Sequence, residues 1–207
     1  PQAKLSWRLA EYELSQAEAA FPFRDHAYVF NQMFGVQSGI PAFLVNQHKV
    51  ASLSDAEAYI SRLEGIPAYL GQNVANAQAS AAKGILPPRF VYDYVLSDSR
   101  GVITGYPFVD EGEDSPLLDD AETITQDEAE TLLARAADAL RDGVGPAYEA
   151  AIVELEAQTS VATTDDGAWK LPDADAYYAM RLKQITTTVM TADEIHELGL
   201  AEVARIQ

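Results

Sequence analysis

The stretch SDAEAYISRLEGIPAYLGQNVANAQASAAKG, from Ser54 to Gly84, carries the longest helical pattern in the chain. Ser54 and Glu57 form a capping box, in which each side chain accepts a hydrogen bond from a free backbone N–H at the helix start. Pro67 predicts a kink, or a division of the helix after Gly65, and Gly84 fits the position just past its end. Apolar residues recur at spacings of three and four, namely Tyr59, Leu63, Ile66, Leu70, Val74 and Ala77. This spacing predicts a helix with one core-facing stripe.

The same start signal recurs twice toward the C-terminus, at Thr125-Gln-Asp-Glu128 and Thr191-Ala-Asp-Glu194. The stripe after the first of these comprises Ala129, Leu132, Leu133, Ala136, Leu140, Val144, Tyr148, Ile152 and Leu155. Gly143, Gly145 and Pro146 interrupt it, so this segment is either one kinked helix or two abutting helices. Capping boxes followed by three-four periodicity predict an all-α fold with little or no sheet.

Shorter helices and one acidic connection account for the rest of the chain. Residues 2–20 predict a helix, and Pro88 and Asp173 each mark the start of another. Residues 97–123 are rich in glycine, proline and acids, which predicts an irregular connection with at most one short helix. We therefore expect a multi-helix array with long kinked helices, forming a single helical region over residues 1–207.

An aromatic cluster occupies residues 21–49, where we expect two short helices broken near Gly35 to Pro41. Its members are Phe21, Phe23, Tyr28, Phe30, Phe34 and Phe43. Such a cluster forms either a ligand platform or part of a core. Core packing is the commoner arrangement, and we expect it here.

Composition and charge exclude several classes of partner. The chain has 207 residues, 48% of them hydrophobic, which is typical of a globular protein. Its net charge is −18 and its pI is about 4.3, so nucleic acid and anionic membrane surfaces are unfavourable partners. It has no cysteine, which excludes disulfides and thiolate metal sites. No apolar run is long enough to span a membrane, and no signal peptide is visible.

The histidines do not form a recognisable metal motif. His196-Glu197 begins like the zinc motif H-E-x-x-H, but position 200, where the second histidine belongs, is Leu200. His26 and His48 lie far away with no ligand-like spacing to each other. We therefore assign no catalytic residue, metal ligand or cofactor to this chain, and we expect it to be inactive alone.

Polar residues near the C-terminus are candidates for a cleft or a helix boundary. At about 100° per residue, Glu202 falls inside the apolar arc of the last helix and His196 at its edge. A carboxylate facing a core is costly without a partner, so we expect Glu202 to meet a cation from a neighbouring helix, with Arg181 as the candidate. Tyr178 is the fourth residue of this candidate set. The stripe of the last helix reaches Ile206 without a stop signal, which predicts an exposed apolar patch, self-association and a chain cut from a longer protein.

Two stretches carry a family resemblance, from Asp55 to Arg89 and from Leu171 to Ile206. The first holds Y-I-x-R-L followed by G-I-x-P-P-R, and the second holds Y-Y, T-T and E-I-H-E-L-G-L-x-E-V-x-R-I. In this order the motifs resemble the bacterial domain-of-unknown-function family 885 (DUF885). The match runs over most of the chain and is weakest in the acidic connection.

The resemblance implies a zincin-like hydrolase for the parent protein. Members of the family are similar to helical zinc metallopeptidases, with an H-E-x-x-P-G-H motif downstream of the E-I-H-E-L-G-L segment. This sequence ends before that motif, so zinc is implied only for the full-length parent. Family members often look exported or lipid-anchored in bacteria, whereas this chain leaves its localisation open.

Two functions follow from these observations. In the first, the chain is a non-catalytic helical lobe of a metallopeptidase-like protein and forms part of a substrate cleft. Its partners are then the remainder of the parent polypeptide and a peptide substrate. In the second, it is an acidic helical binding or interaction module without peptidase activity.

Overall fold

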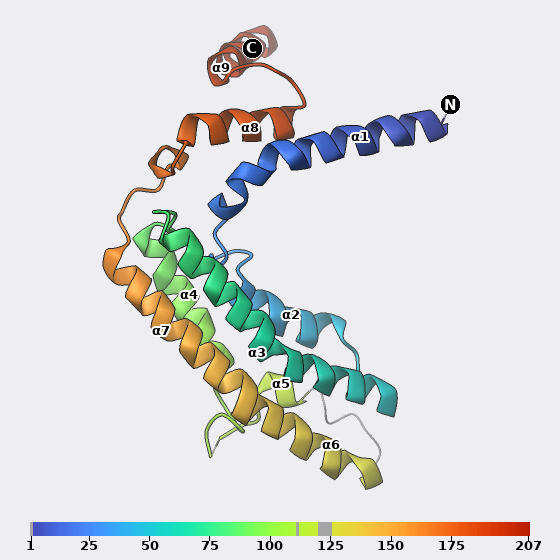
Figure 1. Ribbon diagram of the computed structural model, residues 1–207. Coiled ribbons are helices and arrows are strands. Elements are labelled where there is room, and N and C mark those ends of the chain that lie inside the picture. Colours follow the sequence, from blue (N-terminus) through green and yellow to red (C-terminus); the bar gives the residue numbers. More distant parts are fainter. Residues whose placement is uncertain (1, 111, 120–125) are drawn as a thin grey trace. The chain divides into compact units, whose positions relative to one another are not determined.

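The computed structural model describes residues 2–110, 112–119 and 126–207, and Figure 1 shows its helices. The fold is all-α, as the capping boxes and periodicity predict; the described residues contain no strand, and Tyr106 and Asp114 form an isolated bridge. The elements are α1 Gln2–Ala20, the 3₁₀ helix η1 Phe21–His26, α2 Val36–Gln47, α3 Leu53–Ala81, α4 Arg89–Val102, α5 Pro116–Asp119, α6 Gln126–Asp138, the π-helix η2 Ala139–Val144, α7 Gly145–Val161, the 3₁₀ helix η3 Ala168–Lys170, α8 Ala174–Thr186 and α9 Ala192–Ile206.

The chain folds as two compact units. Unit 2 is Tyr28–Asp165 and contains α2 to α7, and unit 1 joins Pro1–Ala27 to Asp166–Gln207. The single helical region expected for residues 1–207 stays a prediction. No helix of the described residues is both long enough and apolar enough to cross a membrane.

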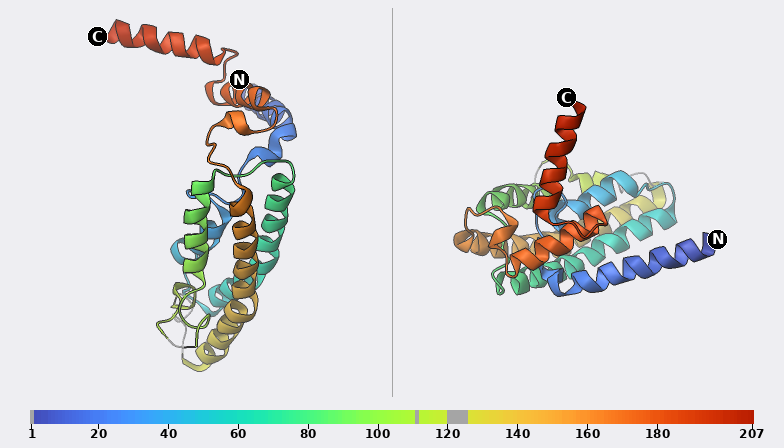
Figure 2. Two further views of the ribbon diagram at one scale, coloured as in Figure 1. Left: turned by 90° about the vertical axis from the view of Figure 1, so that its left-hand side faces the viewer. Right: turned by 90° about the horizontal axis from the view of Figure 1, so that it is seen from above.

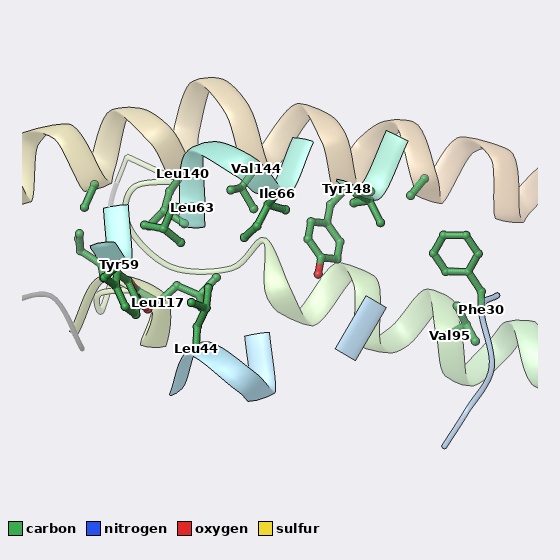
Figure 3. Close-up of a cluster of buried hydrophobic side chains, with 14 of the residues drawn as sticks. Phe30, Leu44, Tyr59, Leu63, Ile66, Val95, Leu117, Leu140, Val144 and Tyr148 are labelled. Atoms are coloured by element: carbon green, nitrogen blue, oxygen red, sulfur yellow. Dashed lines mark hydrogen bonds between the residues drawn. The ribbon is translucent and has the colours of Figure 1, made fainter. Parts of the chain in front are cut away.

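The core of unit 2 forms where α3 and α4 pack against α7, side by side in Figure 2. The stripe predicted on α3 is confirmed, because Tyr59, Leu63, Ile66, Leu70 and Ala77 are buried. The stripe predicted beyond residue 129 is confirmed as well, and its buried members are Leu132, Ala136, Leu140, Val144, Tyr148 and Leu155. Figure 3 shows Leu63 and Ile66 meeting Leu140 and Val144.

A π-helical segment joins α6 to α7 and resolves the two alternatives left by the sequence. Apolar residues recur at a strict spacing of four from Ala136 to Ile152. On an ideal α-helix such a spacing would drift by about 40° at each step. The wider turn of η2, where the Gly145 N–H donates to the Leu140 carbonyl, takes up this drift. The two helices therefore abut through η2 and keep one stripe on the core.

The helix starts differ in part from the predicted capping boxes. Thr191 and Glu194 form the predicted box, and the backbone N–H and hydroxyl of Thr191 hold the pKa of Glu194 below its usual range. The box predicted at Ser54 is wrong, because α3 starts two residues earlier and the Ser52 hydroxyl accepts from the Asp55 N–H at 3.3 Å. Ser52 and Ser54 can both cap a helix. The hydrogen bonds between Ser52 and Asp55 select Ser52 as the cap. Thr125 lies outside the described residues.

Two prolines lie inside continuous helices. α3 runs through Pro67 without division, and α2 runs through Pro41, which was expected in a break. A Cβ on Gly143 would lie 3.2 Å from Pro67 Cγ, so η2 packs closely on the proline ring. Packing of this kind offsets the hydrogen bond that Pro67 removes from α3. Helix α4 also extends to Val102, into the segment expected to be irregular, and α5 is the one short helix described there.

Unit 1 is held together by polar and aromatic contacts. His26 is buried, its Nε2 lies 2.7 Å from the Pro172 carbonyl oxygen, and its ring lies 4.8 Å from that of Tyr177. Helix α8 packs against α1, where Gln184 Nε2 donates to the Gln16 carbonyl at 3.3 Å. Helices α1, α8 and α9 have no buried residue. The apolar patch expected on α9 is exposed, with Val203 54% and Ile206 75% accessible, and self-association stays a prediction.

Candidate functional site

The four polar residues proposed from the sequence lie in unit 1, and no hydrogen bond or ion pair of the described residues joins any two of them. Glu202 is exposed and pairs with Arg205 on its own helix at 2.6 Å. Arg181 instead donates to Gln184 Oε1 at 3.0 Å. The expected contact of Glu202 with Arg181 is therefore wrong. The apolar arc of α9 is open to solvent, so Glu202 needs no partner from another helix, and an exposed pair contributes about 0–1 kcal/mol.

Tyr178 lines a small groove beside the start of α9, whereas His196 is exposed on α9 itself. This groove has a volume of about 320 Å³ and is lined from α8 by Asp175, Tyr178 and Leu182. It contains no cation other than Lys183. The structure thus places Tyr178 at a surface hollow but assembles no reactive group around it.

No metal centre is formed by the part of the chain that the structure describes. No three histidine, aspartate or glutamate side chains there come together in a way that could hold a metal ion. His26 stacks in unit 1, His48 lies in unit 2, and each is engaged by a backbone carbonyl. These residues do not fit a zinc site.

The buried tyrosines of unit 2 are structural groups. Tyr148 donates to the Gln37 carbonyl at 2.7 Å, and Tyr92 donates to Gln158 Oε1 at 3.1 Å. Burial raises the pKa of both phenols. A phenol that keeps its proton and is fully engaged in the core does not act as an acid or base near neutral pH.

An apolar groove lies between α2 and α3 in unit 2. Its volume is about 560 Å³, within the range of roughly 300–1,000 Å³ typical of ligand sites. Its lining residues are Phe34, Gly35, Val36, Gly39, Ile40, Phe43, Leu44, Arg62, Gly65, Ile66 and Tyr69. We call it the α2–α3 groove.

Two glycines keep this groove open. A Cβ on Gly39 or on Gly65 would meet no atom within 4 Å, so their missing side chains leave free space. The floor is firm, because Leu44 and Ile66 line the groove and also belong to the buried core. Any side chain on either glycine would occupy the space that a ligand needs.

The rim of the groove carries exposed aromatic rings and one cation. Phe34 is 86%, Phe43 49% and Tyr69 52% accessible. The expectation that the aromatic cluster packs in a core is wrong for Phe21, which is 64% accessible, and for Phe34 and Phe43, while Phe30 is buried as expected. Phe34 and Phe43 line the groove together with Gly39 and Gly65, which carry no side chain.

Arg62 is the cation on this rim, and its surroundings are polar. Its Nη1 donates to His48 Nδ1 at 2.7 Å and approaches the Ala58 carbonyl oxygen at 3.4 Å. His48 also contacts the Tyr59 ring and lies 3.1 Å from the Asp55 carbonyl oxygen. Neither Arg62 nor His48 was predicted from the sequence as a site residue. The available signal was a lone arginine three residues after the core position Tyr59 and three residues before the groove glycine Gly65.

Comparisons with known proteins agree with this fold. The family described as bacterial protein of unknown function, DUF885, matches residues 1–207. No curated protein matches the chain. A crystal structure from Colwellia psychrerythraea, described as a "putative lipoprotein", superposes with a TM-score of 0.74 at 24% sequence identity.

The solved relative is much longer than this chain. The match covers 86% of this chain and 31% of the Colwellia protein. At this identity the likeness shows the fold alone. The family match spans every residue given and agrees with the motif resemblance, and the chain therefore belongs to the bacterial family of unknown function DUF885.

Proposed function

We propose that this chain is a non-catalytic helical lobe of a longer, zinc-metallopeptidase-like bacterial protein, and that the α2–α3 groove forms one wall of its substrate cleft. The size of the Colwellia relative supports a longer parent, because the matched region is 31% of that chain. The family resemblance implies a zinc motif downstream of α9, and the residues that the structure describes form no group of metal ligands. In this proposal the role of the chain is to bind the substrate peptide.

The observation that carries the proposal is the groove itself. It combines about 560 Å³ of apolar space with exposed rings on its rim and a single arginine. Binding sites for organic ligands are mostly apolar concavities with a few placed polar groups. A side chain of a peptide substrate fits such a space, and the polar rim can orient its backbone.

A second candidate, an acidic helical interaction module without peptidase activity, is favoured by the exposed stripe of α9. Leu198, Val203 and Ile206 are each more than half accessible on that helix. The parent gene distinguishes the two candidates. An H-E-x-x-P-G-H segment downstream of α9 supports the substrate-cleft function, whereas its absence supports the interaction module.

Filling the groove is expected to weaken substrate binding without slowing the chemical step. In the full-length parent protein, Gly65→Leu should raise KM for peptide hydrolysis about ten-fold or more, because an apolar contact worth roughly 1–3 kcal/mol is lost. The value of kcat should change little, since uniform binding is removed. Steady-state kinetics on a panel of peptides measures both constants.

Gly71→Leu is the matched control. Gly71 lies on the same helix, also has no atom within 4 Å of a built Cβ, and does not line the groove. The Gly71→Leu variant should leave both KM and kcat unchanged. Equal KM values for Gly65→Leu and the unsubstituted protein would show that the groove is not part of the substrate cleft. Absence of hydrolysis by the intact parent would favour the interaction module.

A further inference from the structure

We infer that Arg62 makes the α2–α3 groove selective for peptides that present a carboxylate beside an aromatic or aliphatic side chain. This inference rests on the proposed binding role of the groove and names the chemical class of its ligand. The apolar walls take the side chain, and the guanidinium on the rim takes the carboxylate.

One edge of the guanidinium is fixed by the protein. A guanidinium donates hydrogen bonds and accepts none, so His48 Nδ1 is the acceptor of the 2.7 Å bond from Nη1. The hydrogen of the neutral imidazole then lies on Nε2, which donates to the Asp55 carbonyl oxygen at 3.1 Å. Arg62 is thereby held by a neutral group that leaves its charge uncompensated.

The carboxylate of Asp55, the residue whose carbonyl oxygen His48 contacts, is engaged by its own turn. The Asp55 carboxylate accepts from the Ser52 hydroxyl at 2.8 Å and from the Ala51 N–H at 3.2 Å. The hydrogen bond from the Ser52 hydroxyl is the main cause that holds the pKa of Asp55 below its usual range, and the hydrogen bond from the Ala51 N–H adds to it. Asp55 is therefore ionised and satisfied by its own turn, without an ion pair to Arg62.

The other edge of Arg62 is free. Within residues 2–110, 112–119 and 126–207, no hydrogen bond engages its Nε or Nη2, and no carboxylate lies within ion-pair distance of it. By contrast, Arg100 pairs with Glu156 at 2.5 Å and Arg135 with Glu64 at 3.2 Å. In a chain of net charge −18, an arginine left without an acid at an apolar groove is available to a ligand.

The free edge has the geometry of a carboxylate site. Nε and Nη2 present two parallel N–H donors, which match the two oxygens of a carboxylate. Polyanions such as nucleic acid do not suit this site. Their binding needs several clustered cations, whereas this groove has one arginine and the chain as a whole is strongly acidic. The carboxylate can come from a peptide C-terminus or from an acidic side chain next to the apolar residue.

Binding to the 207-residue chain tests the inference without any turnover. Three ligands are titrated into ¹⁵N-labelled protein and followed by amide chemical shifts: N-acetyl-phenylalanine, its amide, and N-acetyl-Asp-Phe-amide. We expect at least one carboxylate ligand to bind about ten-fold more tightly than N-acetyl-phenylalanine amide, as for a charge-assisted hydrogen bond. The shifts should map to α2 and α3. Preference for the first or the third ligand identifies a terminal or a side-chain carboxylate.

Substitutions test the arginine and the apolar walls of the groove separately. Arg62→Met keeps the apolar stem and should abolish the preference for a carboxylate while retaining weak binding of the amide. Gly65→Leu should abolish binding of all three ligands. Arg100→Met, which removes an arginine outside the groove, should bind as the unsubstituted chain does. Circular dichroism checks that each variant keeps its helices.

Three results would overturn the inference. They are equal affinity for acid and amide, a carboxylate preference that survives Arg62→Met, and shifts that map to α8 or α9 instead. Because no hydrolysis is measured, the inference can fail while the KM effect of Gly65→Leu in the parent stands. Equally, an inactive parent leaves this binding result intact.

Discussion

Replacing Leu140 by alanine is expected to destabilise unit 2 by about 3–5 kcal/mol, in the upper part of the range for buried leucines. Leu140 is fully buried in η2, where it meets Leu63 in the core (Figure 3). Its carbonyl also accepts the hydrogen bond from Gly145 that closes the π turn. The backbone is fixed there, so the cavity left by the missing side chain cannot collapse easily.

Urea unfolding followed by far-UV circular dichroism and by amide hydrogen exchange in α3 and α7 measures this loss. Tryptophan fluorescence is unsuitable, because Trp7 and Trp169 both belong to unit 1. Val153→Ala on α7 is the control, since Val153 is 66% exposed. It should change the free energy of unfolding by no more than about 0.5 kcal/mol. Similar losses for the two variants would show that the assigned helix phase is wrong.

The second large effect is expected at Gly35, the residue before α2. A Cβ there would lie 2.6 Å from both the backbone nitrogen and the backbone oxygen of Asn31, and would also collide with Gln37 Oε1. Backbone atoms cannot move aside cheaply. Gly35→Ala should therefore cost about 1–3 kcal/mol, as overpacking does. Urea unfolding measures the change.

The effect of Gly35→Ala should extend to ligand binding. The turn before α2 is built by Asn31, whose Oδ1 accepts from the N–H of Phe34 at 2.7 Å and from that of Met33 at 3.0 Å. Phe34 and Gly35 both line the groove. A displaced turn should therefore weaken binding of all three phenylalanine ligands alike, unlike Arg62→Met, which should affect only the two carboxylates.

Gly39→Ala provides a control of opposite sign. Gly39 lies inside α2, and a Cβ there meets nothing within 4 Å. Alanine favours the helix over glycine by up to about 1 kcal/mol. We expect the free energy of unfolding to rise slightly for this variant. Equal destabilisation at Gly35 and Gly39 would contradict the steric explanation, because only Gly35 approaches other backbone atoms.

The predictable features of this protein are those encoded over one or two helical turns. The spacing of Tyr59, Leu63 and Ile66 identified the buried face of α3, and the pairing of Thr191 with Glu194 identified the start of α9. Both depend on residues three or four positions apart, whose geometry a helix fixes by itself. The helical class followed from such local signals. The start of α3 was misplaced by two residues because two serines competed for one cap.

The candidate site depends on contacts between residues far apart in the chain. Arg62 meets His48 across fourteen residues, and α2 forms the groove with α3 through side chains that periodicity places only relative to their own helix. Phe34 and Phe43 were expected in the core, and Glu202 was expected to face one. Amphipathic spacing shows which face of a helix is apolar. Whether that face is covered depends on which other helix packs against it, and only the tertiary structure decides this.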